Sequence, residues 1–317
     1  MDVEGAGRPA PRFSILLPTH NRADVLPFAI RSVLDQTVRD FELLIVGDGC
    51  TDGTAGVVAG FADPRIRWFN LPKAPHFGYA NRNVALRQAR GDLIAYMAHD
   101  DLWLPDHLEL LGRHFDSVAI AIVYSRALWV APDGLITPTT VNFHDRATLD
   151  QFLRRQENHI PSSCFIHRGT CFADYGYWDE TLPGSGDWDM WARIIAGGGG
   201  RNVAYEPTPT CLHFRASWRT EANAGPSELA TWKALRARGL LPPTLPAVPI
   251  ELGQPEQATT WRSLAAAPAA WTLALRMAVQ LGLDLCAALA HHALDLEDKD
   301  RQIGNLEASL QQSLLYR

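Results

Sequence analysis

Short apolar, β-branched runs alternate with amphipathic helical patterns from Phe13 onward. This alternation is typical of a doubly wound α/β protein with a largely parallel sheet. The expected strands are Phe13–Leu17, Glu42–Val46, Arg65–Phe69 and Leu93–Met97, and the expected helices between them cover 23–36, 51–62 and 78–90.

The pattern changes after residue 100, where we expect the sheet to become mixed. A helix is predicted at 105–115, a strand at 119–124 and a hairpin around Pro132-Asp133-Gly134. A short helix is predicted over 187–196, ended by the glycines 197–200. Two further strands, 201–205 and 209–214, should close the domain.

These elements predict four segments. Residues 1–11 form a flexible N-terminus and 12–238 the α/β domain, while 239–262 is a linker whose prolines exclude regular structure. Residues 263–317 are helical and resemble a coiled coil. The apolar positions of that last segment recur every seven residues, with Gly282 as the weak member: Leu275, Leu289, Leu296, Ile303 and Leu310. Association with a second copy or a partner protein, or packing back onto the domain, would each explain this repeat.

Composition and charge exclude several classes of protein. The 317 residues are 47% hydrophobic and 20% charged, as in globular proteins, and the net charge of −6 offers no attraction for nucleic acid. Five cysteines without paired spacing fit a reducing compartment. No secretory signal and no transmembrane helix are predicted, so we expect a cytoplasmic protein, with peripheral contact at the inner face of a membrane as an option for the C-terminal helix.

Polar residues follow each of the first four strands. In open α/β sheets, ligands bind beyond the carboxyl ends of the strands, so these side chains should converge on one crevice. A carboxylate at Asp48 can accept hydrogen bonds from a nucleobase or ribose, and an arginine at the start of a helix, Arg82, can meet phosphate. Helix capping, turn formation and surface ion pairs explain such residues equally well. The candidates outside the acidic pair are Pro18, Thr19, Asn21, Asp48, Arg82 and His99.

The adjacent carboxylates of Asp100 and Asp101 emerge directly from a buried strand. Two neighbouring acids repel each other unless a cation lies between them. Mn²⁺ or Mg²⁺ would relieve the repulsion and bridge to a diphosphate. The alternative is that Asp101 caps the helix beginning near Pro105.

Further candidates lie in the second half of the domain. Asp187 opens the short helix after a glycine-rich loop, where the helix dipole favours an ionised carboxylate, so it is a candidate base, with Asp189 as its competitor. The spacing of Trp188 and Trp191 favours a place in the core over stacking on sugars. His213 is either a metal ligand or a hydrogen-bonded histidine within a strand.

Taken in order, these motifs resemble glycosyltransferase family 2, inverting enzymes with the GT-A fold. The likeness runs from about Phe13 to Arg215. It is carried by the segments 14–22, Leu34-Asp35-Gln36-Thr37, 46–54, Ala80-Asn81-Arg82-Asn83, Gly91-Asp92, His99-Asp100-Asp101 and 187–191. The fold implied is a Rossmann-like central mixed sheet flanked by helices, with a C-terminal helical appendage.

The resemblance also implies roles for single residues. Thr19 and Asp48 would contact the nucleobase, Arg82 would lie beside the nucleotide, and Asp187 would deprotonate the acceptor. Asp100 would hold the metal, with His213 completing the metal site. The sequence departs from the family pattern at Gly47, Ala98 and Gly186, where acids are common. Ala98 removes the first carboxylate of the D-x-D motif, which weakens the metal site or shifts ribose contacts to His99.

The function implied is transfer of a sugar from a nucleoside-diphosphate sugar, UDP- or dTDP-linked, to a hydroxyl of a glycan or lipid-linked glycan in bacterial surface polysaccharide synthesis. One alternative is an inactive GT-A module that binds nucleotide and recruits partners through its C-terminal helix. A nucleotidyltransferase is a further alternative, but the sequence has no glycine-rich, lysine-containing loop for a triphosphate.

Overall fold

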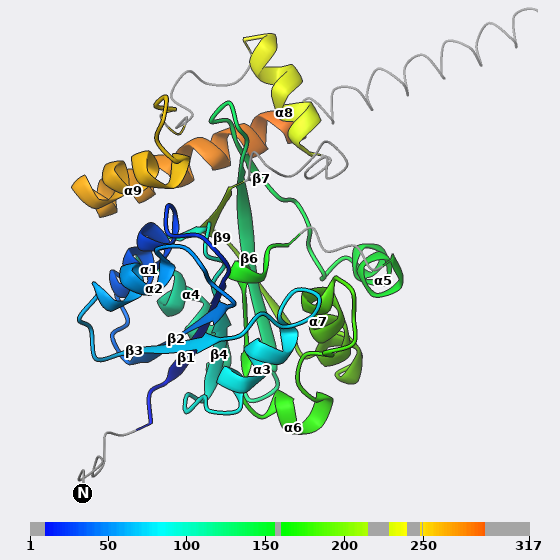
Figure 1. Cartoon of the computed structure of the whole chain (residues 1–317). Coiled ribbons are helices and arrows are strands. Elements are labelled where there is room, and N and C mark those ends of the chain that lie inside the picture. Colours follow the sequence, from blue (N-terminus) through cyan, green and yellow to red (C-terminus); the bar gives the residue numbers. More distant parts are fainter. Residues whose placement is uncertain (1–9, 156–159, 215–227, 240–247, 249, 289–317) are drawn as a thin grey trace, which may run out of the picture.

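A computed structural model describes residues 10–155, 160–214, 228–239, 248 and 250–288. Its centre is one nine-stranded mixed sheet flanked by helices, as the sequence predicts (Figure 1). The strands are β1 (Phe13–Thr19), β2 (Phe41–Asp48), β3 (Ile66–Leu71), β4 (Leu93–Tyr96), β5 (Leu102–Trp103), β6 (Ile122–Val130), β7 (Ile136–Pro138), β8 (Phe165–Arg168) and β9 (Val203–Phe214).

The first half of the sheet is parallel and the second half is mixed. The strand order is β3-β2-β1-β4-β8-β6-β9-β5, with β7 paired to β6. The β3, β2, β1 and β4 strands run in parallel, whereas β8 is antiparallel to both β4 and β6. The β1, β2 and β4 strands are mostly apolar because helices cover both of their faces, whereas the edge strand β3 is partly exposed. Their carboxyl ends therefore share one edge, where the candidate residues emerge.

The helices of the first half alternate with its strands. Figure 1 shows α1 and α2 on one face of the sheet and α3 on the other, as the right-handed crossovers of a doubly wound sheet require. The helices are α1 (Leu26–Leu34), α2 (Thr54–Ala59), α3 (Tyr79–Leu86), α4 (His107–Arg113), α5 (Arg146–Arg155), α6 (Cys171–Tyr175), α7 (Gly186–Gly197), α8 (Glu228–Ala237) and α9 (Glu256–Ala266), with short 3-10 turns at His114–Asp116 and Ser162–Cys164.

The strand β9 corrects one prediction. We expected a break between 205 and 209, because Pro207 and Pro209 cannot donate hydrogen bonds within a sheet. The strand instead runs through both prolines, and its pairing with β6 shifts register between Ser125 and Ala127. This bulge accommodates the prolines without ending the strand.

The C-terminal helices pack against the domain. α9 begins at Glu256, inside the segment expected to be linker, and a second helix spans Pro268–Ala288. Leu264, Leu275 and Val279 join a buried cluster with residues of β5, β6 and β9. For residues 268–288, packing onto the domain is therefore the correct alternative. The remaining heptad positions, 289–310, and most of the segment 1–11 that was predicted to be flexible lie outside the described residues.

Neither of these helices alone is long and apolar enough to cross a membrane, and the same holds for every other helix in the described ranges. α9 and the helix Pro268–Ala288 meet the criteria of length and composition only together, as a pair bent by 113°. All five cysteines are free thiols.

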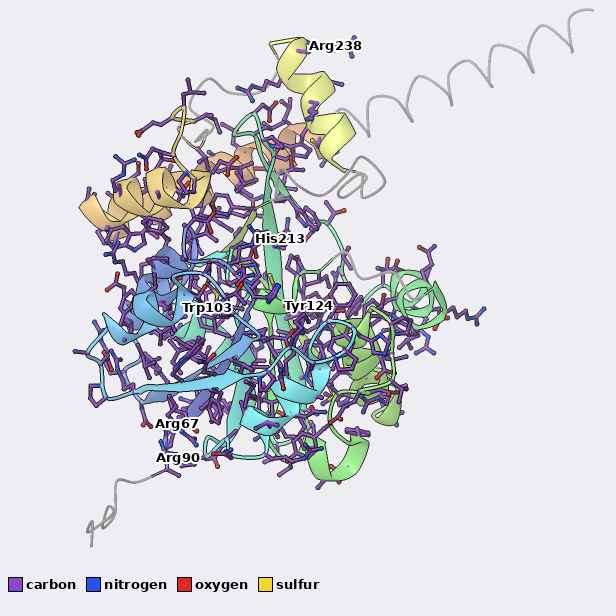
Figure 2. All side chains as sticks on the ribbon, viewed as in Figure 1. Arg67, Arg90, Trp103, Tyr124, His213 and Arg238 are labelled. Atoms are coloured by element: carbon purple, nitrogen blue, oxygen red, sulfur yellow. The ribbon has the colours of Figure 1, made fainter. Side chains whose placement is uncertain are left out.

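Glu42 is a buried carboxylate at the start of β2. It accepts hydrogen bonds from Ser14 Oγ at 2.7 Å, from the backbone and Nε of Arg90 at 2.7 and 3.0 Å, and from Arg67 Nη1 at 3.0 Å. Figure 2 shows Arg67 and Arg90 together at this end of the sheet. Burial by itself would raise the pKa of Glu42, but the bonds from Ser14, Arg90 and Arg67 outweigh it, so the pKa is lowered.

This lowered pKa makes a prediction for Glu42→Gln. A group with a depressed folded pKa stabilises the protein above its unfolded pKa, about 4.3, and loses that contribution as the pH falls through the folded value. The variant should lower the free energy of unfolding by about 1–3 kcal/mol at pH 7. In urea titrations the difference from wild type should shrink below about pH 4. A difference that is constant from pH 7 to pH 3 would contradict this account.

Candidate active site

A cavity of about 410 Å³ lies at the carboxyl ends of β1 and β2. This volume lies in the range of small-molecule sites. Pro18, Thr19, Asp48, Arg82 and His99, all predicted from the sequence, line it together. The other lining residues are His20, Arg22, Val46, Lys73, His76, Phe77 and Gly78.

Asp48 ends β2 and is held in place by three donors. Its carboxylate accepts hydrogen bonds from Lys73 Nζ at 2.5 Å, Ala74 N at 2.8 Å and Asn81 Nδ2 at 2.7 Å. Because a carboxylate has about four acceptor positions, about one is left for a ligand. Gly78, with φ of 72°, is required here, since a Cβ on it would lie 2.5 Å from Asp48 Oδ2. The simple capping role considered for Asp48 is not what the structure shows.

Three polar atoms at this cavity are shielded from solvent and have no hydrogen-bond partner in the part of the chain that the structure describes. They are Thr19 Oγ1, Arg82 Nε and His99 Nε2. Buried polar atoms in proteins are nearly always hydrogen-bonded, and an exception calls for an explanation. Three such atoms around one cavity indicate a site for a polar ligand.

Arg82 is close to two carboxylates, those of Asp48 and Asp187. Its guanidinium lies 5.2 Å from the ring centre of Tyr79 and 4.8 Å from that of Trp178. Burial lowers the pKa of Arg82, and the Tyr79 phenol and the carboxylates of Asp187 and Asp48 act in the opposite direction. Arginine nonetheless stays ionised in proteins. Both carboxylates are therefore close enough to act on the same cation.

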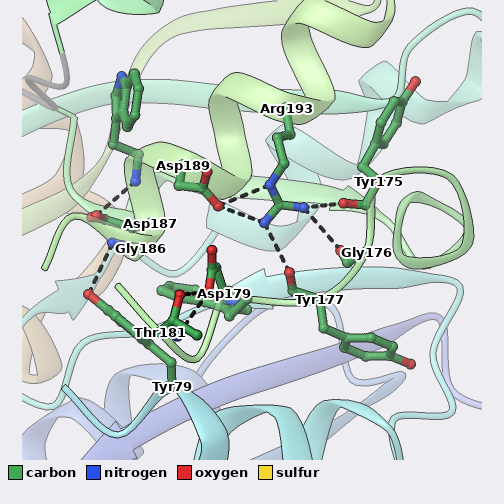
Figure 3. A network of polar contacts seen from close by, with 12 residues as sticks. Tyr79, Tyr175, Gly176, Tyr177, Asp179, Thr181, Gly186, Asp187, Asp189 and Arg193 are labelled. Atoms are coloured by element: carbon green, nitrogen blue, oxygen red, sulfur yellow. Dashed lines mark hydrogen bonds and ion pairs between the residues drawn. The ribbon is translucent and has the colours of Figure 1, made fainter. Parts of the chain in front are cut away.

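Asp187 lies in the first turn of α7. Ser185 precedes the helix in a left-handed conformation, and Gly186 N donates to the Tyr79 hydroxyl at 3.0 Å (Figure 3). This bond ties the start of α7 to the start of α3, beside the cavity. The Asp187 carboxylate accepts from Trp188 N at 2.8 Å. The competitor Asp189 instead forms an ion pair with Arg193, at 2.8 Å, on the side of the helix that faces Tyr175 and Tyr177.

The two adjacent acids after β4 have different surroundings. Asp101 is fully buried and accepts from Ser163 Oγ at 2.5 Å and from His213 Nδ1 at 2.8 Å. Ser163 Oγ also accepts from Ala98 N at 3.0 Å, so Asp101 organises the turn from 98 to 101. No helix-capping bond from Asp101 is present among the described residues.

Asp100 has no such partners. Within the described ranges its carboxylate accepts no hydrogen bond, and the nearest basic side-chain atom is His99 Nε2 at 3.8 Å. His99 Nδ1 donates to the Pro18 carbonyl oxygen at 3.3 Å. The backbone carbonyl of Asp100 accepts from Gln257 Nε2 of α9 at 3.0 Å, so a C-terminal helix contacts the site directly.

The residues of the site can supply one carboxylate, that of Asp100, to a divalent ion. No group of three His, Cys, Asp or Glu side chains suited to a metal occurs in the described part of the chain, and His213 pairs with Asp101 rather than Asp100. Mg²⁺ and related ions in nucleotide sites, however, use one or two carboxylates together with phosphate oxygens. Asp100, whose carboxylate accepts no hydrogen bond from the residues that the structure describes, fits that arrangement.

Asn21, Trp188 and Trp191 do not line the cavity. Asn21 Oδ1 accepts from Thr51 N at 2.7 Å and joins the loops that follow β1 and β2. Trp191 is buried, stacked on Phe165 at 4.8 Å, and Trp188 donates to the Phe152 carbonyl at 2.8 Å. The prediction that the tryptophans belong to the core is confirmed.

The sequence analysis missed the segment between β3 and α3, from which Lys73, His76 and Phe77 line the cavity. The signal available was a polar, proline-containing stretch directly after a strand. Gly47 is also explained: a Cβ there would lie 2.3 Å from the Trp68 ring. Trp68 occupies the space that an acidic side chain at position 47 would need.

The fold and the cavity define a GT-A type α/β protein whose site suits a polar, anionic ligand. The family model for glycosyl transferase family 2 matches residues 14–172, half of the chain. The chain belongs to glycosyl transferase family 2.

Individual proteins are similar to parts of the chain. The chain is 37% identical over 97 residues to an Escherichia coli UDP-Glc:alpha-D-GlcNAc-diphosphoundecaprenol beta-1,3-glucosyltransferase, covering 31% of this chain and 38% of that protein. It is 34% identical over 193 residues to the chondroitin synthase of Pasteurella multocida, covering 58% and 19%. The chain thus spans less than two fifths of either relative.

A solved mannosyltransferase from Pyrobaculum calidifontis, in complex with GDP-Man and Mn²⁺, has the same fold. It matches with a TM-score of 0.51 and 17% identity over 90% of this chain and 80% of that one. Homologues in polysaccharide synthesis and this structural match agree with the family and the fold expected from the sequence motifs.

Proposed function

We propose that the chain transfers a sugar from a nucleoside-diphosphate sugar to an acceptor hydroxyl with inversion at the anomeric carbon. The observation that carries this proposal is that Asp48 and Arg82 line one cavity, while the Asp187 carboxylate is close enough to act on the Arg82 cation. An acceptor for a base, a cation for a diphosphate and a carboxylate for an acceptor hydroxyl are the three groups that the reaction needs.

Each residue has one task in this proposal. Asp48 offers its remaining acceptor position to a single N–H donor, such as the imide of uracil or thymine, which favours a UDP- or dTDP-sugar. Arg82 donates from its unpaired Nε toward the diphosphate. Asp187 takes the proton of the acceptor hydroxyl while that oxygen attacks the anomeric carbon and the diphosphate leaves.

A divalent ion at Asp100, when bound, would neutralise charge on the departing diphosphate. Thr19 Oγ1 and His99 Nε2 are further unpaired groups that the nucleotide can engage. The acceptor is a glycan or a lipid-linked glycan in our proposal, in keeping with the lipid diphosphate named for the E. coli relative.

The experiment that tests the proposal is transfer itself. The purified protein would be incubated with UDP- and dTDP-sugars, with Mn²⁺ or Mg²⁺, and with simple glycan acceptors, and the release of nucleoside diphosphate would be measured. We expect release that depends on the acceptor, and NMR should show an anomeric configuration opposite to that of the donor. Retention of configuration would exclude Asp187 as the base of a single displacement.

The rival of an inactive module rests on Gly47 and Ala98. Gly47 does not support an inactive module, because the Trp68 ring fills the space that a side chain at position 47 would occupy. Tight donor binding without donor hydrolysis or transfer to any acceptor would favour the rival.

A further inference from the structure

Phe77 is an exposed aromatic side chain at the cavity. Its exposed fraction is 61%, and it lines the same cavity as Asp48, Thr19 and Arg82. Exposure of a large ring costs hydrophobic free energy in the unliganded protein. An aromatic ring that lines a cavity while mostly exposed is placed to contact a ligand.

The backbone holds Phe77 there. The residues on both sides are in the left-handed region, His76 with φ of 55° and Gly78 with φ of 72°. That conformation is unfavourable for a residue with a side chain, and such strain is concentrated at ligand sites. Gly78 in turn lies against the Asp48 carboxylate, so the ring and the acid are joined by one tight turn.

Tyr79 and Gly184 are neighbours of the Phe77 ring. The ring is tilted by 35° from Tyr79 with 6.2 Å between ring centres, too far apart for close parallel stacking. On the α7 side, a Cβ on Gly184 would lie 3.5 Å from Phe77 Cε2. That distance is an ordinary van der Waals contact, so Gly184 lies against the edge of the ring.

We infer that Phe77 is the stacking platform for the nucleobase of the donor. This inference rests on the proposed function and assigns a residue that neither the family motifs nor the sequence pattern single out. A nucleobase presents a flat π-face and an N–H edge at once, and this cavity offers it an aromatic ring and an acceptor carboxylate on neighbouring positions. Because every base has a π-face, Phe77 contributes affinity, while Asp48 contributes the choice of base.

The test is titration calorimetry with UDP on four substitutions at this position. Base stacking on an aromatic residue contributes enough affinity that Phe77→Ala should weaken UDP binding by about 5- to 150-fold. Phe77→Leu, apolar but not aromatic, should behave like the alanine variant. Phe77→Tyr and Phe77→Trp should keep affinity near wild type. Val118→Ala, which shortens another highly exposed apolar side chain away from the cavity, is the matched control and should change nothing.

The outcomes separate this inference from the function. If wild type binds UDP and the alanine variant binds it equally well, the inference is wrong and the proposed function stands. If Phe77→Leu restores full affinity, the ring acts as apolar filling and stacking is excluded. If wild type binds neither UDP nor dTDP nor any other nucleoside diphosphate, the proposed function itself fails. Thermal unfolding of each variant checks that all remain folded.

Discussion

Asp187→Asn should lower the turnover of sugar transfer by about 10²- to 10⁴-fold, the contribution typical of a positioned general base. Asparagine keeps the shape of the side chain but cannot accept the proton of the acceptor hydroxyl. The affinity for UDP should change little, because our proposal assigns nucleotide binding to Asp48, Thr19 and Arg82. Turnover would be measured with saturating donor, and UDP affinity by calorimetry.

The chain offers a matched control two residues further along the helix. Asp189→Asn removes a carboxylate of the same helix turn whose partner is Arg193, at 2.8 Å. Since this ion pair is partly exposed, its loss should cost less than about 1 kcal/mol of stability and leave turnover near wild type. Equal losses of turnover in both variants would point to the start of α7 as a structural element and would remove Asp187 from its assigned role.

Asp100→Ala and Asp101→Ala should have opposite consequences, although the two residues are adjacent. Removing the Asp101 carboxylate leaves Ser163 Oγ and His213 Nδ1 in a buried site without their acceptor. Loss of one partner from such a buried group should lower the free energy of unfolding by about 3 kcal/mol. Asp100 accepts no hydrogen bond in the described part of the chain, so its removal should cost under about 1 kcal/mol.

For Asp100, we expect substitution to affect ligand binding rather than stability. Asp100→Ala should stay folded and lose most metal-dependent donor binding, which calorimetry with UDP in the presence and absence of Mn²⁺ would measure. Urea unfolding of both variants gives the stability comparison. Comparable destabilisation by the two substitutions would contradict the division between a structural and a ligand-facing acid.

The sequence predicts the parallel half of the fold well because three of its four strands, β1, β2 and β4, are buried on both faces. Each of these strands is a nearly continuous apolar run, and a polar turn follows it, so its end and the position of Thr19 or Asp48 can be recognised. The prolines of β9 mislead, because whether a bulge accommodates them depends on the pairing with β6. The start of α9 at Glu256 was missed because a run of prolines precedes it in the chain. The helix is recognised only in the folded chain, where Leu264 packs against residues of β5, β6 and β9.

Sequence also leaves the directions of neighbouring side chains undecided. Asp100 and Asp101 look alike in sequence, yet one binds Ser163 and His213, which lie 62 and 112 residues away. That His213 completes a metal site with Asp100 stays a prediction; in the structure its Nδ1 pairs with Asp101. Phe77 escaped notice because its significance depends on Gly78 and Asp48, which approach each other only in the folded chain.

A crystal structure of the protein with bound UDP would test the central claim most directly. We predict that the uracil imide lies within hydrogen-bond distance of Asp48, that the diphosphate lies between Arg82 and Asp100, and that Asp187 faces the open side of the β-phosphate. Nucleotide bound at any other surface of the molecule, without contact to Asp48 and Arg82, would contradict the account.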